Sequence, residues 1–216
     1  MMMDVNEAVA VNANAVAAKK GFGTKQIAFV GMFGAIASVL MFFEIPLFFA
    51  PSFYKIDLSE VPVLIGTFAL GPVAGIAIEL VKILIHLVVK GTSTAGVGEV
   101  ANFVIGCAFL LPAGLIYKMK KCKENALIGM VAGTVAMIIA GCLVNAFVLL
   151  PTYAAAFGMP IEALIEMGTA VNKSVTDLFS FAMLCVAPFN LVKGIVVSVI
   201  TFLLYKRISG VIHKVM

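Results

Sequence analysis

Charged residues are scarce in this chain. Only 12% of its 216 residues are Asp, Glu, Lys or Arg, whereas a soluble domain averages about 25%. Hydrophobic residues make up 62% of the chain, and the mean hydropathy is +1.14. A chain of this composition cannot cover a folded core with a soluble surface, so we predict an integral membrane protein of the cell membrane that crosses it several times.

Motifs that would support catalysis or metal binding are missing as well. The four cysteines (Cys107, Cys122, Cys142 and Cys185) form no CxxC pair, so neither a disulfide framework nor a metal site is indicated. The chain contains no GxxxxGK[ST], HExxH or GxSxG pattern, and these patterns mark nucleotide, zinc-protease and hydrolase sites. We therefore expect no enzyme activity, no catalytic residue, no metal and no cofactor.

The apolar residues fall into six runs that predict an all-α, polytopic membrane protein with six transmembrane helices. The expected spans are about 26–43, 58–70, 72–90, 99–118, 126–150 and 178–205. The second run would be roughly 20 Å long as a helix, so it needs tilt or local thinning of the bilayer. At its start, Asp57 and Glu60 resemble a capping box.

The rest of the chain is predicted to be short tails and connections. Residues 1–23 are expected to be a disordered cytoplasmic tail, 24–210 a single six-helix transmembrane domain, and 211–216 a cytoplasmic tail. The connection between the last two spans should run from Pro151 to Asp177 and include an amphipathic helix over 160–166 on the membrane surface. Pro188 is expected to bend the last span.

Positive charge predicts that both termini are cytoplasmic. In that orientation only Lys55, Lys90 and Lys173 lie outside, and Lys82 and Lys193 lie within spans. The other ten basic residues are cytoplasmic: Lys19, Lys20, Lys25, Lys118, Lys120, Lys121, Lys123, Lys206, Arg207 and Lys214. Such an excess on the cytoplasmic side is usual for membrane proteins. The net charge of +4 thus reflects insertion and requires no nucleic-acid partner.

Three polar side chains interrupt the last two spans at a similar depth. Asn190 and Lys193 are three residues apart and share a helix face. Asn145 and Lys193 should lie roughly 9 and 10 Å below the outer face, by their distances in sequence from Pro151 and Lys206. Polar groups in hydrocarbon are costly unless something meets them. Either hydrogen bonds between helices meet these groups, or a ligand does.

Other polar and aromatic residues are expected at or above that depth on the outer side. They are Glu44, Asp57, Asn102, Tyr153, and Phe53 and Tyr54 in the aromatic loop 47–57. Because exposed aromatic rings are unfavourable, the loop should fold back over an apolar surface or lie in the membrane interface. These residues predict a cavity open to the outside that fits a neutral aromatic molecule with a polar edge.

The third span carries Glu79, Lys82 and His86 on one face. An internal Glu79–Lys82 pair is the favoured interpretation, because paired charges are tolerated within a membrane. The alternative is a proton relay, which would make the protein a proton-coupled secondary transporter. A second alternative is an intramembrane enzyme that uses these groups as acid and base, although no catalytic motif supports it.

The first span carries a stripe of small residues. Ala28, Gly31 and Ala35 lie along it, and Gly34 and Ser38 lie on a neighbouring face. Small side chains let another helix approach closely, which favours association in lipid. The stripe could pack inside the bundle or face a partner protein.

Several segments together carry a resemblance to a known family. They are the small-residue first span, Asp57-Leu58-Ser59-Glu60-Val61-Pro62, the turn Gly71-Pro72-Val73-Ala74-Gly75, the segment from Asn145 to Tyr153, and Pro188-Phe189-Asn190-Leu191-Val192-Lys193-Gly194. Over about residues 24–207 the chain resembles the riboflavin-specific substrate-binding (S) component of energy-coupling factor (ECF) transporters. An S component for another vitamin is the nearest alternative, because such proteins share an architecture and differ in pocket chemistry.

The resemblance implies a function and roles for the residues. The protein would capture riboflavin outside the cell and deliver it inward with a transmembrane coupling subunit and two cytoplasmic ATPase subunits. Asn190 and Lys193 would bind the polar edge of the isoalloxazine, and Asn145 would assist. The loop around Phe53 and Tyr54 would act as a lid.

Further roles follow from the same resemblance. Glu44 or Asp57 would lie near the ribityl hydroxyls. In the family, an AxxxA stripe on the first helix faces the coupling subunit. Here Ala28 is followed by Met32, and the nearest equivalents are Gly31 and Ala35.

Overall fold

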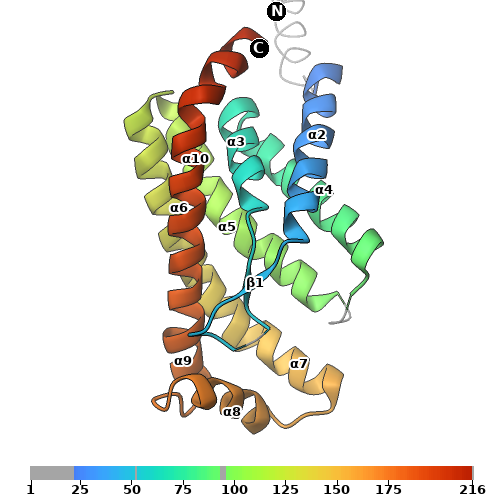
Figure 1. The fold of residues 1–216 in the computed structure, drawn as a ribbon, viewed down its shortest axis with the longest axis vertical. Coiled ribbons are helices and arrows are strands. Elements are labelled where there is room, and N and C mark those ends of the chain that lie inside the picture. The colour runs from blue at the N-terminus through green and yellow to red at the C-terminus, as the bar shows by residue number, and fades with distance from the viewer. Residues whose placement is uncertain (1–21, 52, 93–95, 216) are drawn as a thin grey trace, which may run out of the picture.

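Long apolar helices occupy the predicted spans (Figure 1). The computed structural model describes residues 22–51, 53–92 and 96–215, with the backbone alone at 157 and 206–215. The long helices are α2 (Thr24–Met41), α4 (Pro72–Lys90), α5 (Val97–Met119), α6 (Lys123–Val144) and α10 (Ala187–Val215). The shorter ones are α3 (Glu60–Leu70), α7 (Leu150–Phe157), α8 (Ile161–Val171) and α9 (Leu178–Phe181). All but two residues of the predicted tail 1–23 lie outside the described range.

The helix boundaries agree with the predicted spans to within about three residues, except after Leu150 and at the end of the last span, which was predicted at Tyr205 whereas α10 continues to Val215. The prediction that a connection begins at Pro151 is wrong, because the helix continues through α7 to Phe157. The chain is helical without a break from Lys123 to Phe157, and a π-helical turn, η1 (Asn145–Leu149), lies just before Pro151. The amphipathic helix expected over 160–166 is present as α8.

Five helices in the described part of the chain are long and apolar enough to cross a membrane. They are Thr24–Met41, Pro72–Lys90, Val97–Met119, Lys123–Ala156 and Leu178–Tyr205. Together with the composition, they make the chain an all-helical, multi-pass membrane protein.

Helix α3 is too short to belong to that set, and its surroundings explain why. All of its residues except Leu70 are buried, and it packs against α2, α4, α5 and α10. A helix enclosed by other helices does not have to match the thickness of the lipid itself. The central position of α3 therefore explains how the second predicted span can be shorter than the membrane is thick.

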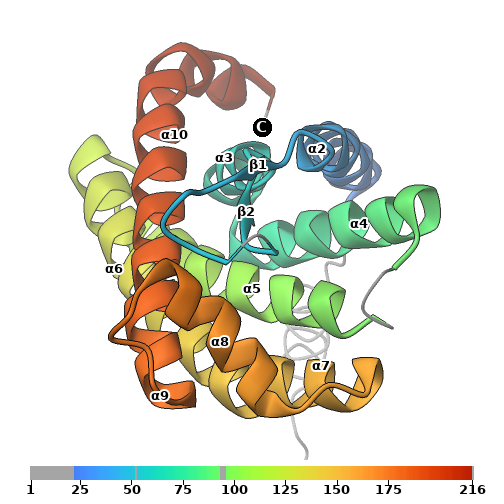
Figure 2. The ribbon, with the colours of Figure 1, turned by 60° about the horizontal axis from the view of Figure 1, so that its bottom comes forward.

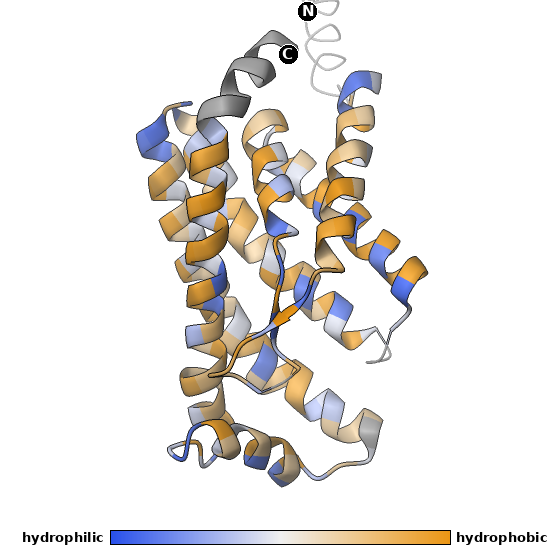
Figure 3. Ribbon diagram, viewed as in Figure 1, coloured by the Kyte–Doolittle hydropathy of each residue, from blue (hydrophilic) through white to orange (hydrophobic). Residues whose placement is uncertain are grey.

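The elements alternate in direction along the bundle. The start of α2, the α5–α6 connection and the end of α10 lie at one end, and α7, α8 and α9 lie at the other (Figure 1). In Figure 3 the helices are largely hydrophobic, and hydrophilic residues gather at the α5–α6 connection and around the centre of the bundle. The polar centre is the region in which the predicted site residues lie.

The two small-residue faces of α2 have different environments. Gly34 and Ser38 are buried, and a Cβ atom added at Gly34 would overlap the side chain of Val81 on α4. Ala28, Gly31 and Ala35 are exposed, and a Cβ atom at Gly31 would meet nothing within 4 Å. The face with Gly34 thus serves packing inside the chain, and the stripe Ala28–Gly31–Ala35 is left uncovered by the residues that the structure describes.

Candidate functional site

A short β-ribbon carries the aromatic loop over one end of the bundle. Strands β1 (Ile45–Pro46) and β2 (Lys55–Ile56) pair antiparallel, with Ile45 opposite Ile56. Between them, Phe53 stacks parallel to Phe181 with ring centroids 6.5 Å apart, and Tyr54 lies 5.2 Å from Phe189. The prediction that this loop folds back over an apolar surface is confirmed.

A cavity of about 620 Å³ lies beneath this loop. Its walls come from the loop, from the end of α2, and from α4, α5, the turn η1 (Asn145–Leu149), α7, α8 and α10. All nine residues predicted to bind a ligand line it: Glu44, Phe53, Tyr54, Asp57, Asn102, Asn145, Tyr153, Asn190 and Lys193. The structure thus brings together residues up to about 150 positions apart in the sequence. Their contacts with a ligand stay a prediction.

Two π-helical turns position the asparagines. The turn η1 (Asn145–Leu149) precedes Pro151, and η2 (Ala182–Val186) precedes Pro188. A proline inside a helix lacks an N–H, and its ring crowds the carbonyl four residues earlier. The wider π turn makes room for the ring, and such turns are frequent at functional sites. Asn145 begins the first turn, and Asn190 follows the second.

The amides of both asparagines are held mainly by their own helices. Asn145 Nδ2 donates to the carbonyl of Gly141 at 2.7 Å, and Asn190 Nδ2 donates to the carbonyl of Val186 at 3.0 Å. Tyr54 donates its hydroxyl to Asn145 Oδ1 at 2.5 Å. Among the described residues, no hydrogen bond joins the two amides to each other. They are therefore oriented in the cavity wall rather than used to bridge the spans.

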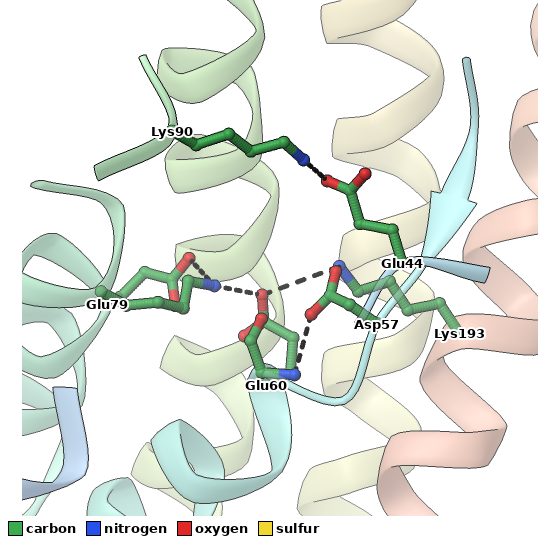
Figure 4. Close-up of polar contacts among 8 residues, drawn as sticks. Glu44, Asp57, Glu60, Glu79, Lys90 and Lys193 are labelled. Atoms are coloured by element: carbon green, nitrogen blue, oxygen red, sulfur yellow. Dashed lines mark hydrogen bonds and ion pairs between the residues drawn. The ribbon is translucent and has the colours of Figure 1, made fainter. Parts of the chain in front are cut away.

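A buried charge cluster extends from the cavity into the bundle (Figure 4). Lys82 Nζ lies 2.7 Å from Glu79 Oε1 and 2.9 Å from Glu60 Oε1. The predicted Glu79–Lys82 pair is confirmed, and all three side chains are almost fully buried. An ammonium group held by two carboxylates is compensated within the protein, so the structure supports the internal pair over a proton relay.

Lys193 joins the cluster from the cavity side, but its contacts are longer. Its Nζ lies 3.5 Å from Asp57 Oδ2 and 3.9 Å from Glu60 Oε1. Charge-assisted hydrogen bonds of this kind are usually about 2.7–2.9 Å long, and an ammonium has three donors. Lys193 is thus buried and oriented, yet it keeps donor capacity on the cavity wall.

Glu60 is the residue of the cluster that the sequence reasoning missed. Its spacing from Asp57 suggested a helix cap, but the carboxylate of Glu60 bonds Lys82 instead. Asp57 Oδ1 accepts from the backbone N–H of Ser59 at 2.8 Å. No local pattern distinguishes the two roles, because the partner of Glu60 is 22 residues away. The apolar lining from α8 (Leu164 and Met167) and from Met159, just before that helix, was also missed.

The electrostatics keep Asp57 ionised. Burial by itself would raise the pKa of Asp57, but the nearby ammonium groups of Lys193 and Lys82 and the hydrogen bonds from Ser59 outweigh burial and lower the pKa. At neutral pH Asp57 therefore remains a carboxylate that holds Lys193 in place.

Glu44 ties the loop to α4 at the rim of the cavity. Its carboxylate lies 3.0 Å from Lys55 Nζ on β2 and 2.6 Å from Lys90 Nζ at the end of α4. Partial burial would raise the pKa of Glu44, but the hydrogen bonds from Lys90 and Lys55 outweigh it and lower the pKa. The bridge is therefore formed at neutral pH, and it fixes the loop over the cavity.

The charge cluster generates a stability prediction. Lys82→Met leaves three carboxyl groups (Asp57, Glu60 and Glu79) with a single ammonium, and we expect it to lower stability by about 3–5 kcal/mol. The wild-type cluster has one more carboxylate than ammonium groups. The double variant Lys82→Met, Glu79→Gln restores that excess of one and should recover part of the lost stability. Thermal unfolding of the purified protein in detergent measures both. A Lys82→Met variant as stable as the wild type would contradict the pairing.

Comparison with known proteins adds independent findings. A family model described as "ECF transporter, substrate-specific component" matches residues 25–205. The chain is 36% identical to the riboflavin transporter RibU of Staphylococcus aureus, over 88% of this chain and 94% of that protein. It is 33% identical to the riboflavin transporter FmnP of Bacillus subtilis, over 88% and 95%.

A solved structure resembles the fold as well. The S component of a bacterial ECF transporter matches with a TM-score of 0.67 and 36% sequence identity, over 86% of this chain and 96% of that chain. The family model extends over the spans that line the cavity, and the solved structure matches most of the chain, so both the sequence and the arrangement of the helices point to the same family.

Proposed function

The chain belongs to the family of substrate-specific components of ECF transporters, and from this membership we propose that it captures riboflavin on the outer side of the membrane for uptake. The observation that carries the proposal is the wall formed by Asn145, Asn190 and Lys193, whose oriented polar groups face a cavity of about 620 Å³ beneath an aromatic loop. Cavities of about 300–1,000 Å³ are typical of small-molecule sites.

The lining of the cavity matches the chemistry of a flavin. The imide edge of the isoalloxazine alternates acceptors with a donor, and the side chains of Asn190 and Lys193, assisted by Asn145, can meet such an edge. The apolar rings can pack against Leu149, Phe189 and the side chains from α8. Phe53 and Tyr54 close the cavity from the loop. The carboxylates of Asp57 and Glu44 also line the cavity and could accept hydrogen bonds from the ribityl hydroxyl groups of riboflavin. Asn102 and Tyr153 complete the polar lining.

We also propose six crossings with both termini in the cytoplasm. Counting α3 as the short sixth span, successive spans run in alternating directions, and the basic α5–α6 connection lies at the same end as the start of α2 and the end of α10 (Figure 1). The excess of Lys and Arg at that end supports a cytoplasmic location. The cavity then lies toward the outer side.

Energy for uptake would come from other chains. Because the sequence has no nucleotide-binding motif, we propose that the protein works with a transmembrane coupling subunit and two cytoplasmic ATPase subunits. The exposed stripe Ala28–Gly31–Ala35 on α2 supports a surface for the coupling subunit, because small residues allow close helix contact in lipid.

The first prediction from this function concerns the polar wall. The wild type should quench the fluorescence of added riboflavin, and Asn190→Ala or Lys193→Ala should each weaken binding by about 1–3 kcal/mol, because the imide edge loses a partner. Ile195→Ala, on the lipid-facing side of α10, is the matched control and should bind as the wild type does. Fluorescence titration measures all four proteins, and unchanged affinity in both polar variants would remove these residues from the site.

The second prediction concerns the stripe on α2. Gly31→Leu should leave riboflavin binding intact but abolish most riboflavin uptake in cells that contain the ATPase module, because the added side chain would block close approach of the partner. Gly34→Leu is the contrasting variant and should lower thermal stability, because its side chain would overlap Val81. If Gly31→Leu transports riboflavin normally, the stripe is not the partner surface.

A further inference from the structure

His86 is a buried side chain of the cavity wall that no role described so far explains. It lies on α4, four residues after Lys82, and is 6% exposed. Its ring packs against Phe42 with centroids 5.2 Å apart, and it lines the cavity. Neither Nδ1 nor Nε2 has a hydrogen-bond partner among the residues that the structure describes.

The absence of a partner sets His86 apart from other polar groups around the cavity. Asn145 makes two hydrogen bonds, and Glu44 is held by two lysines. An imidazole offers at least one donor, and when neutral it also offers an acceptor. Because buried polar groups are nearly always hydrogen-bonded in native proteins, these nitrogens indicate that an occupant of the cavity supplies the partner.

The walls of the cavity differ in polarity. The η1 turn and α10 provide the amides and the ammonium of Lys193, and α8 provides apolar side chains. The wall formed by α4 and α5 is polar again, with His86 and Asn102. In Figure 2, α10 and α4 lie on opposite sides of α3 and the β-ribbon. His86 therefore approaches an occupant from a different side than Asn190 and Lys193 do.

Riboflavin has a second polar region besides its imide edge, namely the hydroxyl groups of its ribityl chain. A hydroxyl both donates and accepts, so it can satisfy either nitrogen of an imidazole. We propose that His86 hydrogen-bonds a ribityl hydroxyl and thereby makes the site select flavins that carry a polyol chain. This inference rests on the proposed function and assigns a specificity-determining residue within it.

The test compares two flavins. Lumiflavin has the same ring system as riboflavin but a methyl group in place of the ribityl chain. His86→Phe keeps an aromatic ring against Phe42 and removes both nitrogens, and His86→Gln restores a donor and an acceptor. The control, Leu84→Phe, adds a ring on the exposed side of the same helix. Fluorescence titration of each purified protein with each flavin gives the dissociation constants.

We expect the affinity for riboflavin to change and the affinity for lumiflavin to stay nearly the same. His86→Phe should weaken riboflavin binding about tenfold, the loss of one hydrogen bond with a buried group, and should leave lumiflavin binding within about twofold. His86→Gln should recover part of the riboflavin affinity, and Leu84→Phe should change neither constant. Retained lumiflavin binding shows that the His86→Phe protein is folded.

Three outcomes would overturn the inference. If His86→Phe binds riboflavin as tightly as the wild type, the ring only packs against Phe42. If the variant weakens both flavins equally, His86 supports the shape of the cavity rather than contacting the ribityl chain. If the wild type binds neither flavin, the proposed function itself fails and this inference fails with it, whereas the first two results leave riboflavin capture intact.

Discussion

The structure depends on one constraint, which is that polar side chains inside a membrane protein must be met by partners because hydrocarbon cannot solvate them. Lys82 obeys it completely, since two carboxylates lie within 3 Å of its ammonium. Lys193 obeys it only in part, since its nearest carboxylate oxygen is 3.5 Å away. The difference separates a structural ion pair from a group that keeps capacity for a ligand.

Glu60 connects these two situations. It contacts Lys82 at 2.9 Å and Lys193 at 3.9 Å through the same oxygen, Oε1, and it begins α3, the helix enclosed by the rest of the bundle. A ligand that binds Lys193 therefore contacts a side chain that is linked through Glu60 to Lys82 and to the central helix α3. Helix α2 likewise connects two regions, the exposed small-residue stripe and the cavity. Phe42, directly after the helix, packs on His86, and Glu44, two residues later, lies at the rim of the cavity.

The sequence predicted those features that depend on single residues standing out from their surroundings. Asn145, Asn190 and Lys193 are conspicuous within apolar runs, and their depth could be estimated from helix rise alone, so their convergence in one cavity was foreseeable. The pair Glu79–Lys82 was foreseeable for a similar reason, because residues three apart on a helix lie on one face. The structure brings the three residues to one cavity and forms the Glu79–Lys82 pair.

Features that depend on distant contacts could not be predicted in the same way. The role of Glu60 depends on Lys82, and the tolerated shortness of α3 depends on four surrounding helices. The helix past Pro151 was missed because a proline reads locally as a helix end, whereas the π turn before it makes room for the ring. His86 was placed with Glu79 and Lys82 by spacing, yet the structure places it at the cavity and in no ion pair with them among the described residues.

The most direct test of the central claim is the identity of the small molecule that the protein retains from its host. Protein purified from cells grown with riboflavin should be yellow, and mass spectrometry of the denatured sample should find riboflavin in nearly equimolar amount. The polar wall of Asn145, Asn190 and Lys193 would then have its partner. A colourless preparation that carries no flavin and takes up none when riboflavin is added would contradict the account.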